Sequence, residues 1–148
     1  MRNRSMPLSV VIPVLVYPDV REAVAWLCNS FGFVERLRIG THRAQLSFGK
    51  GAIIVSEMRR DSGVSSSEAS GLRSLPAGWV GHSVMIRMAD IDRHYERAER
   101  SGARIVSPPT DYPYGERQYT AEDLGGHQWT FSQTIADVDP ETWGGELF

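Results

Sequence analysis

The apolar and polar positions of this chain follow the same order twice. In the first half, apolar residues at positions 10–16, several of them β-branched, predict a strand. Asp19 then predicts a helix cap, with Glu22 three residues later in capping-box spacing, and Gly32 marks the end of the helix. One apolar stripe runs along this helix, through Val20, Ala23, Val24, Leu27 and Phe31. Three further strands are expected, at residues 34–39, 42–48 and 52–57.

The second half repeats this pattern. A strand is expected at residues 83–88, Asp90 caps the next helix, and Gly102 ends it. Three more strands follow, at residues 103–106, 117–122 and 127–133. From capping Asp to terminating Gly the chain advances 13 positions in the first half and 12 in the second. Two units of one order and almost one spacing indicate an internal duplication. The pattern predicts an α+β fold with two βαβββ modules, residues 8–58 and 79–135.

Two segments fall outside the modules. Residues 59–78 are rich in Ser and Gly and show no apolar period, so we expect a flexible linker between the modules. Residues 136–148 form a polar C-terminal tail that ends in apolar side chains. The pattern leaves the roles of both segments open.

Composition and charge narrow the classes of partner. The chain is 41% hydrophobic and 23% charged, with a net charge of −2 and interleaved acids and bases. No cluster of Lys and Arg indicates a nucleic acid or a membrane surface as partner. The single cysteine, Cys28, excludes an internal disulfide and a cysteine-based zinc site. No signal-type or membrane-spanning apolar run is found, so we expect a cytoplasmic protein.

The line from residue 112 to residue 129 carries a more specific signal. It reads Tyr-Pro-Tyr-Gly-Glu-Arg-Gln-Tyr at residues 112–119 and Glu-Asp-Leu-Gly-Gly-His-Gln-Trp at residues 122–129. With the duplicated βαβββ order, it resembles the vicinal oxygen chelate superfamily of glyoxalases, bleomycin-resistance proteins and extradiol dioxygenases. Leu124 stands where the family signature usually has proline. The resemblance covers about residues 8–134.

The resemblance implies a cup. Each module is expected to curl its mixed sheet, with the helices packed outside and a small-molecule site inside. Chains of this length in the superfamily usually pair, so a homodimer is expected. Whether each cup forms within one chain or across the dimer is left open.

Catalytic members of the superfamily hold a divalent metal through the first and last strands of each module. The corresponding positions in this chain are Ile12, Val55, Ser83 and Thr130. Catalytic members have His or Glu there. Ile and Val offer no lone pair, and a lone hydroxyl is a poor ligand for Zn²⁺, Ni²⁺ or Fe²⁺. We therefore expect no metal and no other cofactor.

A displaced metal site is the alternative. It would recruit His82, Glu57 and Glu122. A shift of one residue on a strand reverses the face on which each side chain lies, and this shift would turn Arg87 into the core. The displaced site is therefore disfavoured. His127 follows the glycines of the signature turn, which indicates a role in the turn.

Strand alternation predicts which side chains line the cup. The expected ligand-binding residues are Arg43, Gln45, Met85, Arg87, Gln118, Thr120, Gln128 and Thr130, beside aliphatic walls from Ile12, Val14, Val16, Ile53 and Val55. Two arginines favour a carboxylate or phosphate on the ligand. The alternative, equally open here, is that each arginine pairs with Glu57 or Glu122.

Three functions remain open. The first is a metal-free small-molecule binding protein similar to the bleomycin-resistance branch, which protects by binding and performs no chemistry. The second is an enzyme, a glyoxalase-type lyase or dioxygenase with a displaced metal site. The third is an interaction module with a vestigial cup. The missing ligands favour the first function over the second, and the polar cup favours it over the third, because a vestigial cup should fill with apolar side chains.

Overall fold

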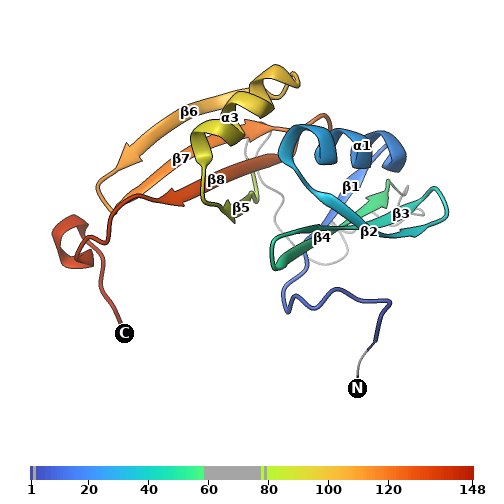
Figure 1. The fold of residues 1–148 in the computed structure, drawn as a ribbon, viewed down its shortest axis with the longest axis horizontal. Coiled ribbons are helices and arrows are strands. Elements are labelled where there is room, and N and C mark those ends of the chain that lie inside the picture. Colours follow the sequence, from blue (N-terminus) through green and yellow to red (C-terminus); the bar gives the residue numbers. More distant parts are fainter. Residues whose placement is uncertain (2, 59–77, 79) are drawn as a thin grey trace.

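The computed structural model describes residues 1, 3–58, 78 and 80–148 of the chain. The expected linker at residues 59–78 therefore lies outside the described residues, apart from its last position. Figure 1 shows the two modules side by side, with their helices on one side of both sheets.

The first module forms one four-stranded sheet, called sheet A here. Its elements are β1 (Val14–Tyr17), α1 (Val20–Phe31), β2 (Val34–Ile39), β3 (Arg43–Phe48) and β4 (Gly51–Glu57). The strand order is β1-β4-β3-β2, with β1 parallel to β4 and the remaining pairs antiparallel.

The second module repeats this topology in sheet B. Its elements are β5 (Val84–Arg87), α3 (Ile91–Arg100), β6 (Arg104–Tyr112), β7 (Glu116–Glu122) and β8 (Gln128–Thr134). The order is β5-β8-β7-β6, again with one parallel pair, β5 and β8. The prediction of an α+β fold from two βαβββ modules is confirmed.

Both helices begin where the caps predict. The Asp19 side chain accepts a hydrogen bond from the Glu22 amide at 3.0 Å, and Asp90 accepts one from the Arg93 amide at 3.2 Å. Gly32 follows α1 with φ +82°, the left-handed conformation that glycine adopts without steric cost. The capping residues thus fix where each helix begins.

Two strand boundaries differ from the prediction by more than one residue. β1 begins at Val14, and the preceding Val10 and Val11 are 98% and 80% exposed. Pro13 lacks the N–H that a ladder position would use, although its carbonyl accepts a hydrogen bond from the Ile54 amide at 2.9 Å. β6 extends to Tyr112 rather than ending at residue 106, because pairing with β7 resumes after register shifts on either side of Ser107 and continues to Tyr112.

One hydrophobic core serves both modules. The ring of Phe31 in α1 lies 5.8 Å from that of Trp129 and 4.9 Å from that of Phe131, both in β8, and all three side chains are fully buried. Edge-to-face contacts of this kind add to the free energy that burial contributes. The two sheets are therefore held at their helix side by shared aromatic packing.

A buried carboxylate joins the modules at a second point. Asp123, in the turn between β7 and β8, accepts hydrogen bonds from the Tyr17 hydroxyl at 2.5 Å and the Trp129 indole at 3.0 Å. It also accepts from the amides of Gly125 at 2.9 Å and His127 at 3.0 Å. Since Tyr17 belongs to β1, this network ties the signature turn of one module to the first strand of the other. Burial raises the pKa of the Tyr17 hydroxyl, and the nearby Asp123 carboxylate raises it further.

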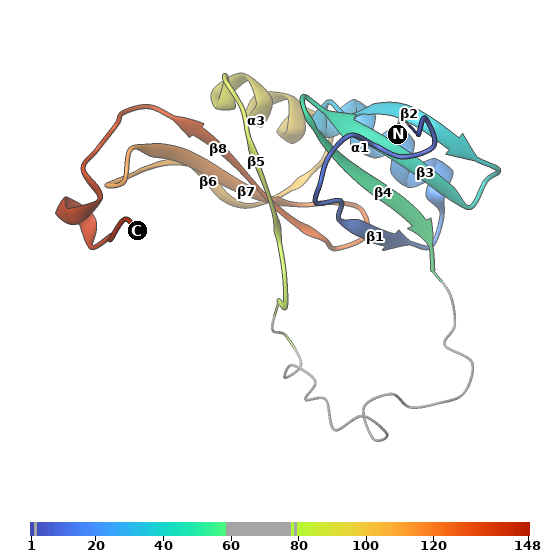
Figure 2. The ribbon, with the colours of Figure 1, turned by 90° about the horizontal axis from the view of Figure 1, so that it is seen from below.

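The N-terminal segment, residues 3–9, lies on the face of sheet A opposite the helices. Figure 2 shows this segment passing over β3 and β4. At the other end of the chain, a short 3-10 helix (Pro140–Trp143) follows β8. In the described part of the chain, no helix is long and apolar enough to cross a membrane.

Candidate functional site

The polar face of sheet B holds most of the predicted ligand-binding residues. Val84, Ile86, Trp129 and Phe131 belong to the core or pack against it, on the side of α3. Because side chains alternate along a strand, the neighbours of these residues on β5 and β8 lie on the opposite face. The residues of β7 that pair with β8 at those positions lie there too. These are Met85, Arg87, Gln118, Thr120, Gln128 and Thr130.

Hydrogen bonds order the centre of this face. The hydroxyls of Thr120 and Thr130 are bonded to each other at 2.9 Å. The Gln118 amide donates to the Ser132 hydroxyl at 3.0 Å and accepts from the Tyr114 hydroxyl at 3.2 Å. These hydrogen bonds fix the orientations of the Gln118, Thr120 and Thr130 side chains on this face. Sequence reasoning left Ser132 and Tyr114 out of the candidate set, although Ser132 follows the same strand alternation as Thr130.

Aromatic side chains stand at one end of the same face. The rings of Tyr112 and Tyr114 stack nearly parallel, with centroids 5.3 Å apart. Trp143, from the tail, meets Tyr114 edge-on at 5.6 Å and is 41% exposed. The tail, whose role the sequence pattern left open, therefore contributes to this face.

Arg87 lies at the open edge of sheet B. Its guanidinium donates to the Thr134 hydroxyl at 3.1 Å, and the neighbouring Met85 is 59% exposed. Glu122, one of the two carboxylates considered as its partner, instead pairs with Arg104 at 3.1 Å. Among the described residues Arg87 forms no ion pair.

The polar face of sheet A carries the other two predicted residues, Arg43 and Gln45. The Arg43 guanidinium lies 3.3 Å from the Ser56 hydroxyl, to which it donates. Gln45 is only 3% exposed, because the N-terminal segment covers it: its amide donates to the Ser5 carbonyl at 2.8 Å, and its oxygen accepts from Arg36. Gln45 is thus already bonded within its own chain.

The two aliphatic positions predicted on β4 lie on the other side of the sheet. Val55 and Ile53 pair with Ala44 and Leu46, and all four belong to the core beneath α1. The neighbouring Ile54, 5% exposed, pairs with Gln45 and lies on the polar face instead. Alternation could not reveal this, because residues 52–55 are all apolar.

Among the described residues, Arg87 lines a cavity next to sheet A that Arg43 and Gln45 do not line. This cavity of about 400 Å³ lies between the β3–β4 hairpin and β5, and its walls include Phe48, Lys50, Met85 and Arg87. Neither Arg43 nor Gln45 lines it. The two predicted arginines therefore belong to separate surfaces of one chain.

The donor set at the family's metal positions does not fit a metal ion. Val55 lies in the core, and the face position beside it is Ile54, which has no lone pair. On sheet B, Thr130 pairs with Met85, and its hydroxyl is bonded to Thr120. In the part of the chain that the structure describes, no three His, Cys, Asp or Glu side chains are grouped so as to hold a metal.

His127, the neighbour of the His82 named in the displaced-site hypothesis, has other contacts. The ring of His127 lies 6.4 Å from that of His82, but its Nε2 is bonded to the Val16 carbonyl at 2.8 Å. Its ring also meets Tyr17 edge-on at 4.8 Å. His127 therefore helps to hold the turn against β1, the role that its place after the glycines indicated.

Comparison with known proteins gives the same fold. A family model described as "Glyoxalase/Bleomycin resistance protein/Dioxygenase superfamily" matches residues 9–131. This chain is similar to TioX from Micromonospora sp. ML1, whose crystal structure superposes on it with a TM-score of 0.67. The two sequences are 35% identical, and the match covers 86% of this chain and 99% of the TioX chain.

Less similar proteins also match this chain, one by structure and one by sequence. A glyoxalase/bleomycin resistance protein/dioxygenase from Nocardioides is 21% identical over 97% of this chain and 91% of its own, with a TM-score of 0.63. The uncharacterized protein Rv0887c of Mycobacterium tuberculosis (strain ATCC 25618 / H37Rv) is 24% identical over 133 residues, covering 86% of this chain and 75% of its own.

Proposed function

Since the chain belongs to the glyoxalase/bleomycin resistance protein/dioxygenase superfamily, we propose that it binds a small organic molecule on the polar face of sheet B, without a metal. The observation that carries this proposal is the composition of that face. Met85 and Arg87 stand exposed beside the ordered pair Thr120 and Thr130, so that an apolar, a cationic and a hydrogen-bonding group are presented together. Small-molecule sites combine such groups.

The ligand chemistry follows from these side chains. Arg87 suits a carboxylate or phosphate, because a guanidinium binds two oxygens at once in a charge-assisted pair. The stacked rings of Tyr112 and Tyr114 suit a flat part of the same ligand. We therefore infer an anion with a flat, apolar body. The absence of suitable ligand donors at the family's metal positions supports binding without metal-assisted chemistry.

A second copy of the chain would complete the site. Val14 and Val16 on sheet A are 51% and 40% exposed, and Met85 on sheet B is 59% exposed, although all three are apolar. Apolar surface on the open faces of both sheets favours a partner that covers it. A homodimer that places sheet A of one copy opposite sheet B of the other would bring Arg43 and Arg87 to one cavity. Light scattering at micromolar concentration should then give twice the mass of one chain.

The binding test uses matched pairs of compounds. A thermal-shift screen should pair each aromatic carboxylate with its neutral amide, and the carboxylates should raise the melting temperature more. For the best carboxylate, Arg87→Ala should weaken binding by about 1.5–3 kcal/mol, the range for a hydrogen bond to a charged group. Arg93→Ala, which removes an equal charge from the exposed side of α3, should not.

Two outcomes would contradict this proposal. One is a screen in which the neutral amides raise the melting temperature as much as their carboxylates. The other is an equal loss of affinity in Arg87→Ala and Arg93→Ala, because this would show a response to net charge rather than to the position of the guanidinium.

A further inference from the structure

A groove along α3 lies on the helix side of the molecule, away from the polar faces of both sheets. Its volume is about 660 Å³. One wall is α3 itself with the residues just before it, from Met88 to Asp90, and Phe48 of the β3–β4 hairpin completes the lining. Neither Arg43 nor Arg87 lines it, so the groove is separate from the face that carries the proposed function.

The charges of α3 are arranged in two stripes. Arg93, Arg97 and Arg100 follow at intervals of four and three residues, so they share one side of the helix, and all three line the groove. The acidic residues of α3 repeat this spacing one position earlier and lie on another side. One of them, Asp92, binds Arg117 of β7 at 2.9 Å. In the described part of the chain, the groove therefore meets the basic stripe of α3 and not the acidic one.

The positive charge of this arginine stripe is largely uncompensated. In the part of the chain that the structure describes, none of the three arginines forms an ion pair. The carboxylate of Asp90 also lines the groove, but it accepts the capping hydrogen bond from the Arg93 amide at 3.2 Å. His94 lines the groove as well, and burial lowers its pKa, so that the ring is neutral at pH 7. The groove thus has an excess of positive charge.

Arg97 is held in position by the first module. Its Nε donates to the Asn29 carbonyl at 2.8 Å, and its Nη2 donates to the Cys28 carbonyl at 3.1 Å, near the end of α1. Arg93 and Arg100 are exposed on either side of it along the helix. A cation that is already fixed loses little conformational freedom when a partner binds. The middle of the arginine stripe is therefore preorganised.

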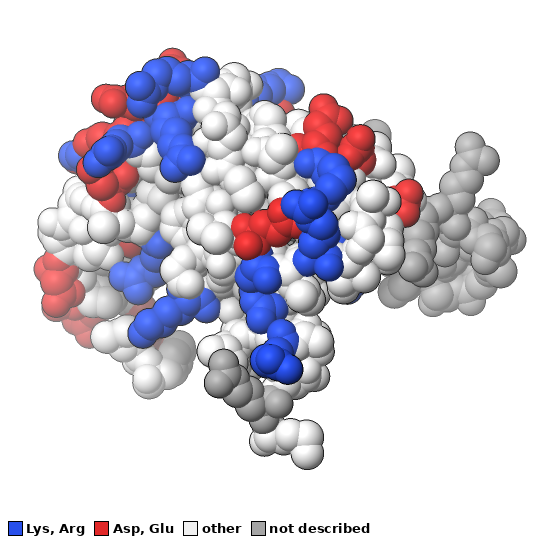
Figure 3. All heavy atoms as spheres, turned by 45° about the vertical axis from the view of Figure 1, so that its right-hand side comes forward, with Lys and Arg blue, Asp and Glu red and all other residues white. Residues whose placement is uncertain are grey.

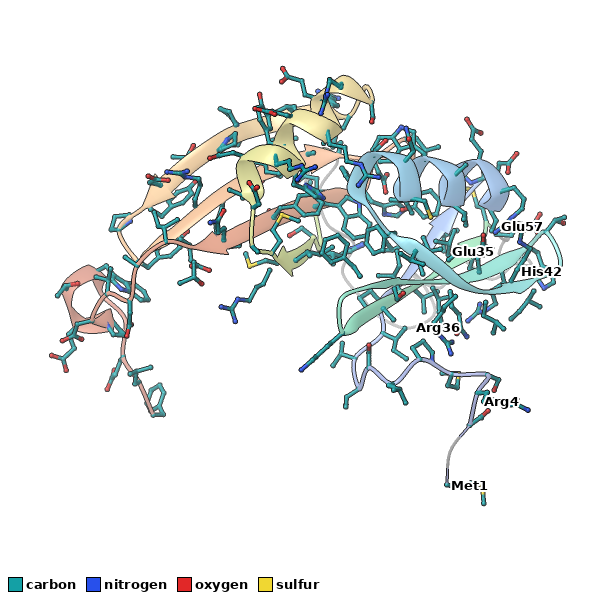
Figure 4. All side chains as sticks on the ribbon, in the orientation of Figure 1. Met1, Arg4, Glu35, Arg36, His42 and Glu57 are labelled. Carbon is teal, nitrogen blue, oxygen red and sulfur yellow. The ribbon has the colours of Figure 1, made fainter. Side chains whose placement is uncertain are left out.

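The other basic side chains of the molecule do not extend this stripe. Figure 4 shows Arg4 and Arg36 on the side of sheet A that faces away from the helices. In the view of Figure 3, a row of basic side chains runs down toward the N-terminal segment, whereas basic and acidic side chains lie together at the upper left, over α3. The arginine stripe is therefore a local feature of one helix.

The length of the stripe favours a peptide over a small anion. Arg93 and Arg100 lie about 10 Å apart along the helix axis, at a rise of about 1.5 Å per residue. One carboxylate or phosphate is too small to meet all three guanidinium groups. An extended peptide places alternate side chains on one side about 6–7 Å apart, close to the about 5–6 Å between neighbours in the stripe. Three acidic residues at alternate positions would therefore face the three arginines.

The apolar part of the groove suits the residues between those acids. Phe48 and Met88 line it and are half-buried, packed against the core from outside. In an extended segment, the side chains between the acids point the opposite way from them. Apolar side chains at these positions can cover the exposed parts of Phe48 and Met88 while the acids meet the arginines.

We propose that this groove binds an extended acidic segment of a partner protein, in which acidic and apolar residues alternate. Arg93, Arg97 and Arg100 pair with the acidic side chains, and Phe48 and Met88 contact the apolar ones. Complementary charge of this kind selects the partner and speeds its association. The proposal does not depend on ligand binding on sheet B.

The test uses two peptides and two double variants. The probe is the fluorescein-labelled peptide Ser-Glu-Leu-Glu-Leu-Glu-Ser, and its control has Gln in place of each Glu. The main variant combines Arg93→Gln with Arg100→Gln, which leaves the contacts of Arg97 with α1 in place. The matched control combines Arg38→Gln with Arg104→Gln, which removes the same charge from exposed arginines outside the groove.

The Kd of the acidic peptide, measured by fluorescence anisotropy, should rise about tenfold in the main variant, because each exposed cation contributes only a few-fold in screened solvent. It should change by less than about twofold in the matched control and in Arg87→Gln. The Gln peptide should bind the wild type more weakly than the acidic peptide does. In NMR spectra of the wild type, the acidic peptide should shift the amides of α3 and Phe48 most.

Equal affinity of the wild type and the main variant for the acidic peptide would overturn the proposal. So would an equal loss in the matched control, because this would show a response to net charge alone. A loss confined to Arg87→Gln would place the peptide on sheet B and overturn the proposal, while leaving the proposed function intact. If light scattering showed association of the wild type but not of the main variant, the acidic tail of a second copy would occupy the groove instead, and the partner proposal would fail.

Discussion

Replacing Asp123 by alanine should be among the most destabilising single changes in this protein. The carboxylate is 6% exposed and accepts four hydrogen bonds, from the Tyr17 hydroxyl, the Trp129 indole and the amides of Gly125 and His127. Tyr17 and Trp129 are themselves 1% and 0% exposed, so that water cannot replace the lost acceptor. The two amides lie in an exposed turn, where water can replace it.

The magnitude follows from the two buried donors. A buried donor left without a partner costs about 1–3 kcal/mol. Tyr17 and Trp129 together therefore predict a loss of about 2–6 kcal/mol, and we expect about 4 kcal/mol. A domain of this size has a total stability of about 5–15 kcal/mol. Tyr17→Phe removes one donor but leaves the carboxylate with three, so it should cost only about 1–2 kcal/mol.

Urea denaturation, followed by tryptophan fluorescence and circular dichroism at one fixed protein concentration, measures these values. In a double-mutant cycle, Tyr17→Phe should cost less than about 0.5 kcal/mol once Asp123→Ala is present, because its partner is already gone. A cost below about 1 kcal/mol for Asp123→Ala, or additive costs for the pair, would refute the view that this carboxylate joins the two modules.

Three further outcomes are expected. Burial lowers the pKa of His94 below its usual value of about 6.5, and one ring nitrogen is bonded to the Tyr119 hydroxyl at 2.5 Å. The folded state therefore binds the proton less well than the unfolded state, so the protein should lose stability as pH falls below about 6.5, and His94→Phe should flatten this loss in urea titrations between pH 7 and 5. Gly115→Ala should cost about 2–3 kcal/mol, because its φ is +84° and a Cβ would lie 2.1 Å from the Ala136 carbonyl oxygen; Gly102→Ala, at φ +86° in open space, should cost about 1 kcal/mol in the same assay. Elemental analysis of the purified protein should find no stoichiometric Ni, Zn, Fe or Mn, and one tightly held metal per chain would contradict the metal-free function.

The sequence by itself determined the duplicated topology, because the signals for it are local. A capping Asp, an apolar stripe and a terminating Gly act within one helix and do not depend on distant residues. Asp19 and Asp90 cap their helices as predicted, and the element order that follows each of them is the same. Alternation on β7 and β8 also predicted which side chains lie on the polar face, since only one face of these strands is apolar.

The tertiary structure alone decided the face of β4. Residues 52–55 are all apolar and at most 8% exposed. Their sequence therefore cannot show which of them face the core and which face the polar side. Val55 was therefore predicted on the polar face but lies in the core, and Ile54 takes the polar face. Pairing with β3, whose own alternation is clear, sets this register.

Contacts between segments far apart in the chain also could not be predicted from local sequence patterns. Gln45 was predicted to line an open face, yet residues 3–9 cover it, and its hydrogen bond to the Ser5 carbonyl forms only once the N-terminal segment meets sheet A. The buried role of Asp123 depends on the fold, which brings Tyr17 to it across 106 positions of the chain. Such contacts depend on how the modules pack, and packing is a property of the whole chain rather than of any window along it.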